Sequence, residues 1–232
     1  MKMNPIYYLL SKLIYGYRAT PTTYSRYLKK RCLFFGEGVY FTNPHKTIID
    51  HDALHFIHIG NYVQILSGVT ILAHDESYTV CGPVYKSYPR TQKITYIDDN
   101  VFIGMNSIIL MGSHIGSNTI IGAGSVVSGL IEPNSVYAGN PARKIMSLEQ
   151  YYTAHVAKFE ISANLFFSNF YARHGRYPNE NEQHVYAVLF KGQDIMVGNN
   201  KPKSIVDIVN ANYPQKYNTI EEFMSISRFN LE

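Results

Sequence analysis

An aliphatic residue returns at every sixth position through the middle of this sequence. The series is Ile97, Ile103, Ile109, Ile115, Ile121 and Val127. A second series, four positions after each of these, is Val101, Ser107, Ser113, Thr119, Ser125 and Ile131. An α-helix needs apolar spacings of three and four, and a half-buried strand needs a spacing of two. A period of six therefore predicts short strands joined by turns and stacked as a β-solenoid, in which each hexad forms one flat side.

The same phase extends upstream, with weaker matches toward its start. Its members are Phe35, Phe41, Thr47, Ala53, Ile59, Ile65 and Ile71. The spacing from Ile71 to Ile97 is not a multiple of six, so we expect residues 73–96 to leave the coil as a loop. We expect the solenoid to end at Pro133-Asn134, with an exit strand and turn that run to Ile145.

Helical patterns precede the repeat. The apolar residues of segment 6–17 fall on one helical face, which predicts a helix that caps the open end of the solenoid. The alternative is an interfacial helix that meets a membrane holding a lipid-linked substrate. The few cations on the polar face of this helix favour the cap. A second helix is expected over residues 22–32.

Helical patterns also follow the repeat. Ser147 and Gln150 form a capping box that starts a helix over residues 148–171. Further helices are expected over 180–190 and 204–210, and a second capping box at Thr219 and Glu222 starts the last one. The predicted organisation is thus an N-terminal helical cap (1–34), a β-helix domain (35–145) with the loop 73–96, and a helical C-terminal extension (146–232).

Composition limits the classes of function. The chain has 232 residues, of which 46% are hydrophobic, as expected for a soluble globular protein with one core and an appendage. A net charge of +4 suits an anionic small molecule, and no basic run indicates nucleic acid. Cys32 and Cys81 match no metal or redox spacing, so a cytoplasmic, reducing compartment is expected. Segment 6–10 is too short for a signal peptide, and no segment is long enough to span a bilayer.

The order and spacing of five motifs indicate a family resemblance. They are Ile57-His-Ile-Gly-Asn61, Leu72-Ala-His-Asp75, Ile103-Gly-Met-Asn106, Ile121-Gly-Ala-Gly-Ser-Val-Val127 and Ala138-Gly-Asn-Pro-Ala142. With them the chain resembles the hexapeptide-repeat acyltransferases, and among these the maltose, galactoside and polysaccharide O-acetyltransferases and the nearby xenobiotic acetyltransferases. The resemblance covers residues 35–145, and more loosely the Tyr-rich tail.

The resemblance implies a mainly β fold, a single-stranded left-handed parallel β-helix. The left hand comes from the resemblance alone, because the general preference is for right-handed crossovers. It also implies a homotrimer with active sites at the subunit interfaces, and transfer of an acetyl group from acetyl-CoA to a hydroxyl.

His74 matches the family's catalytic histidine by its place where the coil breaks into the loop. A sugar hydroxyl is a poor nucleophile at neutral pH, and an imidazole, with an ordinary pKa of about 6.5, suits removal of its proton during attack on a thioester. The other ring nitrogen needs an orienting acceptor, for which a backbone carbonyl, Asp75 and Glu76 are candidates. A covalent serine route is disfavoured, because Ser125 fills an inner slot of the repeat and no Gly-x-Ser-x-Gly elbow is present.

The resemblance further implies a coenzyme A groove along the later coils. The matching positions, from the thioester to the nucleotide end, are Gly104, Met105, Ala123, Ser128 and Arg143. A backbone N–H near Gly104–Met105 would serve as the oxyanion donor, and Arg143 with Lys144 offers charge for phosphates. Two departures from the family pattern stand out: Phe102 replaces a frequent Trp, and Ser128-Gly129 replaces a Thr-Lys pair. The second removes a cation near the nucleotide.

Candidate acceptor contacts come from the loop and from the segment before it. They are Asp50, Asp75, Glu76 and Tyr85. Aromatic faces with interleaved polar groups suit a sugar, and the same composition suits packing against a neighbouring subunit.

Several alternatives stay open. The upstream histidines, His45, His51, His55 and His58, invite a metal interpretation, but no ligand spacing is visible and we expect no metal. The acceptor is expected to be a sugar of a surface polysaccharide or its precursor. A xenobiotic O-acetyltransferase of the streptogramin or chloramphenicol kind, a sugar N-acyltransferase and a non-catalytic β-helix scaffold are the alternatives.

Overall fold

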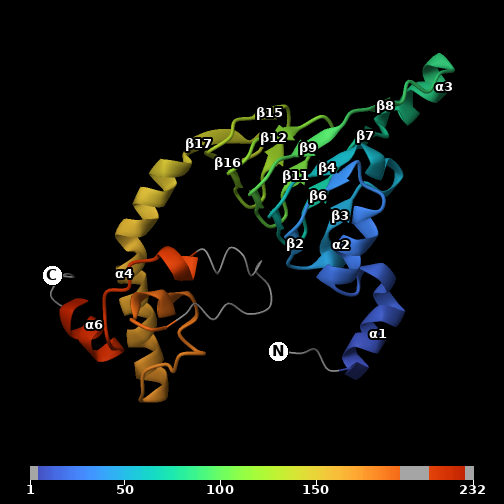
Figure 1. The fold of residues 1–232 in the computed structure, drawn as a ribbon. Helices are drawn as coiled ribbons and strands as arrows, with labels where there is room; N and C mark the ends of the chain where they lie inside the picture. Colours follow the sequence, from blue (N-terminus) through green and yellow to red (C-terminus); the bar gives the residue numbers. More distant parts are fainter. Residues whose placement is uncertain (1–4, 194–208, 228–232) are drawn as a thin grey trace. The chain divides into compact units, whose positions relative to one another are not determined.

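The computed structural model describes residues 5–193 and 209–227, which Figure 1 draws in colour. The chain divides into two compact units near residue 151, here called the coil unit (Lys2–Tyr151) and the C-terminal unit (Tyr152–Glu232). Each is described by itself.

Three mainly parallel sheets of very short strands make up the coil unit. Sheet A contains β1 (Phe34–Phe35), β4 (Ile57–Ile59), β9 (Thr95–Ile97), β12 (His114–Ile115) and β15 (Leu130–Ile131). Sheet B contains β2 (Tyr40–Phe41), β5 (Gln64–Ile65), β10 (Phe102–Ile103), β13 (Ile120–Ile121), β16 (Ser135–Ala138) and β17 (Arg143–Ser147). Sheet C contains β3 (Ile48–Ile49), β6 (Thr70–Ile71), β11 (Ile108–Ile109) and β14 (Val126–Val127).

Successive strands pass from sheet A to sheet B to sheet C and back again, so three hexads complete one coil. Ile103 pairs with Ile121, which is 18 positions further along, and Ile97 pairs with Ile115 in the same way. This register explains the sequence period, because each hexad supplies one strand and one corner.

Both predicted series point into the core. Every member of the two series between Ile97 and Ile131 is at most 2% exposed. The hydroxyl residues of the inner series satisfy backbone groups there: Ser107 donates to the carbonyl of Gly122 at 3.0 Å, and Ser113 donates to that of Leu110 at 2.6 Å. Small hydroxyl side chains therefore fill the corners without leaving a buried polar group unpaired.

The first coil departs from the strict period. A 3-10 helix, η2 (Pro44–Lys46), adds two residues between β2 and β3, and a second, η3 (His51–Phe56), adds four more before β4. The strand residue that pairs with Ile71 is consequently Ile49, and the phase predicted through Thr47 and Ala53 is wrong for strand positions. Both residues are nevertheless fully buried, so the sequence shows no break in the six-residue period at these positions.

The end of the coil is also later than predicted. Beyond Pro133-Asn134, β16 still pairs in parallel with β13, with Ile121 opposite Tyr137. Only β17 reverses direction and pairs antiparallel with β16. β16 therefore extends sheet B by one parallel strand before the chain leaves the repeat.

One corner of the coils is lined by a ladder of asparagines. Asn100, Asn118 and Asn134 all have a positive φ of 53–58°, a conformation that asparagine tolerates better than other residues with a side chain. The Asn100 side chain donates to that of Asn118 at 2.8 Å, and Asn118 donates to Asn134 at 3.0 Å. The ladder thus joins neighbouring coils as well as turning the chain.

Two substitutions at Asn118 are expected to separate these contributions. Asn118→Gly removes the side-chain hydrogen bonds but keeps the backbone conformation accessible, whereas Asn118→Ala removes both. We expect Asn118→Ala to lower the free energy of unfolding by about 1–2 kcal/mol more than Asn118→Gly does. Urea unfolding measures this difference; equal losses in the two variants would contradict a role for backbone strain at this corner.

The N-terminal helices are α1 (Pro5–Tyr15) and α2 (Pro21–Lys29), joined by η1 (Gly16–Arg18). The covering role belongs to α2, whose Tyr24 and Leu28 are fully buried against the coil core. The prediction that the first helix buries its apolar face as a cap is wrong, because Leu9, Leu13 and its other described aliphatic side chains are 52–84% exposed.

The C-terminal unit has its own aromatic core. It contains most of α4 (Leu148–His174), whose first four residues belong to the coil unit, together with η5 (His184–Leu189) and α6 (Ile220–Ser227). Phe167, Phe190 and Phe223 are buried together in it. The predicted capping box holds at the start of α4, where Ser147 N–H donates to the Gln150 side chain at 2.9 Å and Gln150 N–H donates to Ser147 Oγ at 3.1 Å.

Two other predictions for the tail fare differently. The helix expected over 180–190 is wrong in type and length, since only the 3-10 helix η5 forms there. The helix expected over 204–210 lies largely outside the described residues. Among the helices that the structure describes, none combines the length and the apolar character needed to cross a bilayer.

Candidate active site at the break in the coil

The coil opens where sheet C gives way to sheet A. After β6 the chain forms β7 (His74–Asp75), η4 (Ser77–Val80) and α3 (Cys81–Tyr85), and it returns through β8 (Thr91–Gln92) to β9. Strands β7 and β8 pair antiparallel, with His74 opposite Gln92. The loop therefore leaves as a hairpin that projects from the coil and carries α3 near its tip (Figure 1).

Asp50 lies beneath the start of this hairpin. It follows β3 directly, and its N–H donates to the carbonyl of Ile71 at 2.9 Å, so the sheet C register brings it beside residues 73–74. One oxygen, Oδ2, accepts from the N–H of Ala73 at 2.9 Å and from the N–H of His74 at 3.1 Å. These donors stabilise a carboxylate whose side chain is only 2% exposed.

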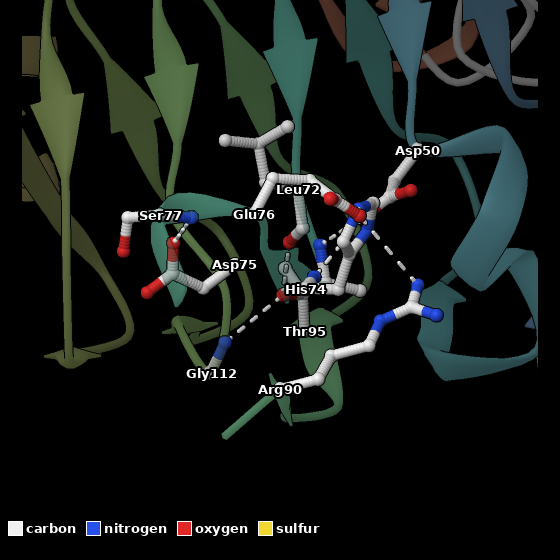
Figure 2. Close-up of polar contacts among 10 residues, drawn as sticks. Asp50, Leu72, His74, Asp75, Glu76, Ser77, Arg90, Thr95 and Gly112 are labelled. Atoms are coloured by element: carbon white, nitrogen blue, oxygen red, sulfur yellow. Dashed lines mark hydrogen bonds and ion pairs between the residues drawn. The ribbon is translucent and has the colours of Figure 1, made fainter. Parts of the chain in front are cut away.

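The same oxygen also contacts the imidazole of His74 at Nδ1 (Figure 2). A carboxylate at Nδ1 holds the proton there and leaves Nε2 as the basic nitrogen. The His74 side chain is 10% exposed, so the ring is largely enclosed by protein. Ring orientation and tautomer are therefore set by a buried group from an earlier coil.

The outer nitrogen of His74 faces a second carboxylate. Nε2 lies 2.8 Å from Glu76 Oε1, and the guanidinium of Arg90 lies 3.9 Å from the same oxygen. The Glu76 side chain is 58% exposed, in contrast to Asp50. Glu76 therefore occupies the position beside Nε2 that an incoming hydroxyl would have to take. Because its side chain is exposed, it can move aside.

A threonine hydroxyl fastens the base of the hairpin. Thr95 Oγ1 donates to the carbonyl of Leu72 at 2.7 Å and accepts from the N–H of Gly112 at 3.1 Å. The side chain is fully buried. It links the residue where the loop leaves, the strand where it returns and the next coil, and so it fixes the backbone from which His74 projects.

Replacing this hydroxyl is expected to cost stability. In Thr95→Val the shape is kept, but the carbonyl of Leu72 and the N–H of Gly112 lose their partner, which costs about 1–3 kcal/mol. Thr95→Ser keeps the hydroxyl and is the matched control. Urea unfolding of both variants tests this; a Thr95→Val protein as stable as Thr95→Ser would show that the hydroxyl does not fasten the loop.

The predicted acceptor residues are only partly brought together. Glu76 reaches His74, and Asp50 lies beneath the ring rather than on the side open to an acceptor. Asp75 turns toward Ser77 instead, whose N–H donates to it at 2.7 Å (Figure 2). Hydrogen bonds from the hydroxyl and from the N–H of Ser77 lower the pKa of Asp75 and keep it ionised. Tyr85 lies at the end of α3 and is 75% exposed.

Three predicted coenzyme positions meet at another corner, between sheets B and C. A Cβ on Gly104 would lie 2.5 Å from the backbone nitrogen of Ala123, and the N–H of Gly124 donates to the carbonyl of Met105 at 2.8 Å. The close approach explains why position 104 is a glycine. The N–H of Gly104 donates to the carbonyl of Ile121 at 2.8 Å, so of the predicted pair the N–H of Met105 is the candidate oxyanion donor.

The two positions expected near the nucleotide are both exposed. Ser128 is exposed between β14 and β15, and Arg143 is exposed on β17. Lys144, the second cation considered for phosphates, is already paired with Glu132 at 2.6 Å. Within one chain, therefore, the structure does not gather all the predicted coenzyme residues around His74.

The structure bears on two alternatives, a serine nucleophile and a metal site. Ser125 is fully buried and donates to the carbonyl of Gly122 at 2.6 Å, which disfavours it as a nucleophile. Across residues 5–193 and 209–227, no cluster of three or more His, Cys, Asp or Glu side chains is placed to hold a metal ion.

Sequence reasoning missed the roles of Asp50 and Thr95. Asp50 was considered only for acceptor contact, because its neighbour across sheet C could not be identified while the first coil was assumed to keep the strict period. For Thr95 a signal existed: it is a polar residue in the buried register just before Ile97, where the repeat restarts.

A three-sided repeat interrupted at a histidine is similar to the repeat of the bacterial hexapeptide transferases. The family model described as bacterial transferase hexapeptide (six repeats) matches residues 94–129. The resemblance to hexapeptide-repeat acyltransferases predicted from the motifs is thereby confirmed.

Individual relatives match more residues than the family model does. Protein CapG of Staphylococcus aureus is 46% identical over 99 residues, which cover 43% of this chain and 57% of that protein. The galactoside O-acetyltransferase of Lactococcus lactis is 36% identical over 107 residues, covering 46% of this chain and 49% of that protein. This chain thus spans about half the length of the curated relatives it matches. A solved maltose O-acetyltransferase from Clostridium difficile aligns with a TM-score of 0.44 at 27% identity, over 61% of this chain and 84% of that one.

Proposed function

We propose that this protein is an acetyl-CoA-dependent O-acetyltransferase that transfers an acetyl group directly to a sugar hydroxyl of a surface polysaccharide or its precursor. The observation that carries the proposal is the imidazole of His74, which is held at Nδ1 by a buried carboxylate and faces the exposed carboxylate of Glu76 at Nε2. The similarity to a galactoside O-acetyltransferase supports the reaction and the class of acceptor.

The fold we propose is a left-handed parallel β-helix that assembles as a homotrimer. The cyclic order of the three sheets supports the helix, and the hand follows the family resemblance. The separation of the predicted coenzyme corner from His74 along one chain supports the trimer. A groove completed by a neighbouring subunit would place Gly104, Met105 and Ala123 beside that subunit's thioester site.

The proposed reaction is a single displacement through a tetrahedral intermediate. Glu76 moves aside, and the acceptor hydroxyl hydrogen-bonds to Nε2 of His74. As the hydroxyl oxygen attacks the thioester carbonyl, Nε2 takes its proton, and Asp50 stabilises the imidazolium that forms. The N–H of Met105 donates to the oxyanion. When the intermediate collapses, the carbon–sulfur bond breaks and the imidazolium returns its proton to the leaving thiolate.

The remaining proposals concern the cofactor and the compartment. Acetyl-CoA is the only co-substrate, and Arg143 and Ser128 contact its nucleotide end. Both cysteines that the chain contains, Cys32 and Cys81, are free thiols, which supports a reducing, cytoplasmic location.

Thiol release from acetyl-CoA tests the proposal directly. We expect release only with hydroxyl acceptors from a panel of galactosides, glucosides and capsular oligosaccharides, and the product should be an ester by mass spectrometry. The same panel includes amino sugars, whose amide product would indicate an N-acyltransferase, and streptogramin and chloramphenicol antibiotics, whose acetylation would indicate a xenobiotic enzyme. No release with any acceptor would favour a non-catalytic scaffold.

A further inference from the structure

The first helix presents an aliphatic face to the outside. Its residues Leu9, Leu10, Leu13 and Ile14 are 65%, 52%, 84% and 69% exposed. At about 100° per residue, these four positions fall within an arc of about 140° on one side of the helix. A contiguous exposed aliphatic face of this kind marks an interaction surface, because isolated apolar residues rather than clusters are usual on a protein surface.

The opposite side of α1 holds the helix to the rest of the coil unit. Ser11 is 9% exposed and donates through Oγ to the carbonyl of Ala19 at 3.3 Å. The ring of Tyr15 stacks on the imidazole of His45, with 3.9 Å between the ring centroids. Because these contacts fix the orientation of the helix, its aliphatic face is directed outward in the folded coil unit.

Charge indicates what covers this face. Residues 1–34 contain seven Lys and Arg residues and no Asp or Glu. The whole chain has 21 basic and 17 acidic residues, so the remaining residues carry three more acidic than basic ones. All the net positive charge is therefore concentrated on the segment that carries the aliphatic face, and a partner with negative charge is favoured.

The same segment combines the aliphatic face with exposed cations and tyrosines. Lys12 is exposed on α1 beside the aliphatic arc, and Arg26, Lys30 and Arg31 are exposed on or just after α2. Tyr15, the last residue of α1, is 46% exposed, and Tyr17, in η1, is 39% exposed. A segment with this composition is typical of proteins that bind at a membrane interface.

We propose that α1 binds the surface of an anionic lipid bilayer, with Leu9, Leu10, Leu13 and Ile14 inserted among the acyl chains and with exposed cations of this segment, Lys12 among them, on the headgroups. Without clustered acidic groups the segment meets no repulsion at such a surface. This binding is independent of acetyl transfer and would hold the coil unit at a membrane whether or not the proposed reaction is correct.

The test is sedimentation of the full chain with vesicles of phosphatidylcholine containing about a third phosphatidylglycerol. We expect binding that falls steeply with added salt and is much weaker to phosphatidylcholine alone. The double variant Leu9→Glu and Leu13→Glu should lower binding roughly tenfold or more. Leu130→Glu is the matched control, because Leu130 is 73% exposed on β15, and it should bind as the unsubstituted chain does.

A second measurement separates the remaining outcomes. Light scattering without vesicles gives the mass of the unsubstituted chain and of the double variant. Equal masses together with lost vesicle binding support the proposal. A smaller mass for the double variant would assign the face to a second copy of the chain and overturn it. Equal binding of the unsubstituted chain to anionic and neutral vesicles, or unchanged binding of the double variant, would also overturn it.

Discussion

Replacing His74 with alanine is expected to lower kcat for thiol release by about 10²–10⁴-fold, the usual contribution of a positioned general base. Nε2 faces only the exposed side chain of Glu76, which can move aside, and Asp50 fixes the tautomer that makes Nε2 basic. The KM for acetyl-CoA should change little, because three of the predicted coenzyme positions, Gly104, Met105 and Ala123, lie at a different corner of the coil. Steady-state kinetics with a saturating acceptor measure both quantities.

The chain offers a matched control for this variant. His114 on β12 also contacts a carboxylate, with its Nε2 3.1 Å from Asp98 Oδ2, but it lies on sheet A and not on the hairpin that carries His74. We expect His114→Ala to retain normal turnover. Light scattering should show the same oligomeric mass for both variants. Normal turnover in His74→Ala with an unchanged mass would contradict the proposed mechanism.

Replacing Asp50 with asparagine should have the second largest effect. The amide keeps the size of the side chain but removes the negative charge that stabilises the imidazolium. We expect kcat to fall at least about tenfold and at most about 10⁴-fold, the upper end being the loss known for a catalytic-triad carboxylate. Asp98→Asn, which alters the pair of His114 in the same way, should leave kcat unchanged.

A double-mutant cycle distinguishes positioning from a merely structural role. If Asp50 acts only through the imidazole, the double variant His74→Ala, Asp50→Asn should be no slower than His74→Ala alone. Additive losses would mean that Asp50 acts on the substrate or on folding instead. Asp50→Ala is less informative, because it also leaves the N–H groups of Ala73 and His74 without their acceptor.

The regular coils could be predicted from the sequence because burial alone dictates them. A coil of three two-residue strands gives every sixth residue the same environment, so Ile103 and Ile121 reveal the register without any knowledge of distant contacts. The loop was visible for the same reason: residues between Ile71 and Ile97 break the period. His74 was then identified by its position at that break.

The contact between Asp50 and His74 could not be predicted, because it depends on an irregular coil. Asp50 reaches His74 only because η2 shifts β3 by two residues and brings Ile49 opposite Ile71. The apolar period continued through buried Thr47 and Ala53 and concealed this shift. The first helix was mispredicted for a related reason: its amphipathic pattern shows that one face is apolar, but a pattern does not say whether that face meets the protein core.

The most direct test of the account is a crystal structure with coenzyme A bound. It should place the coenzyme's sulfur within about 4–5 Å of His74 Nε2, close enough for the same nitrogen to serve the attacking hydroxyl and the leaving thiolate. Asp50 should remain on Nδ1, and a neighbouring subunit should contribute the corner of Gly104, Met105 and Ala123. Coenzyme A bound elsewhere, with Nε2 facing no groove that a thioester can enter, would contradict the proposed active site.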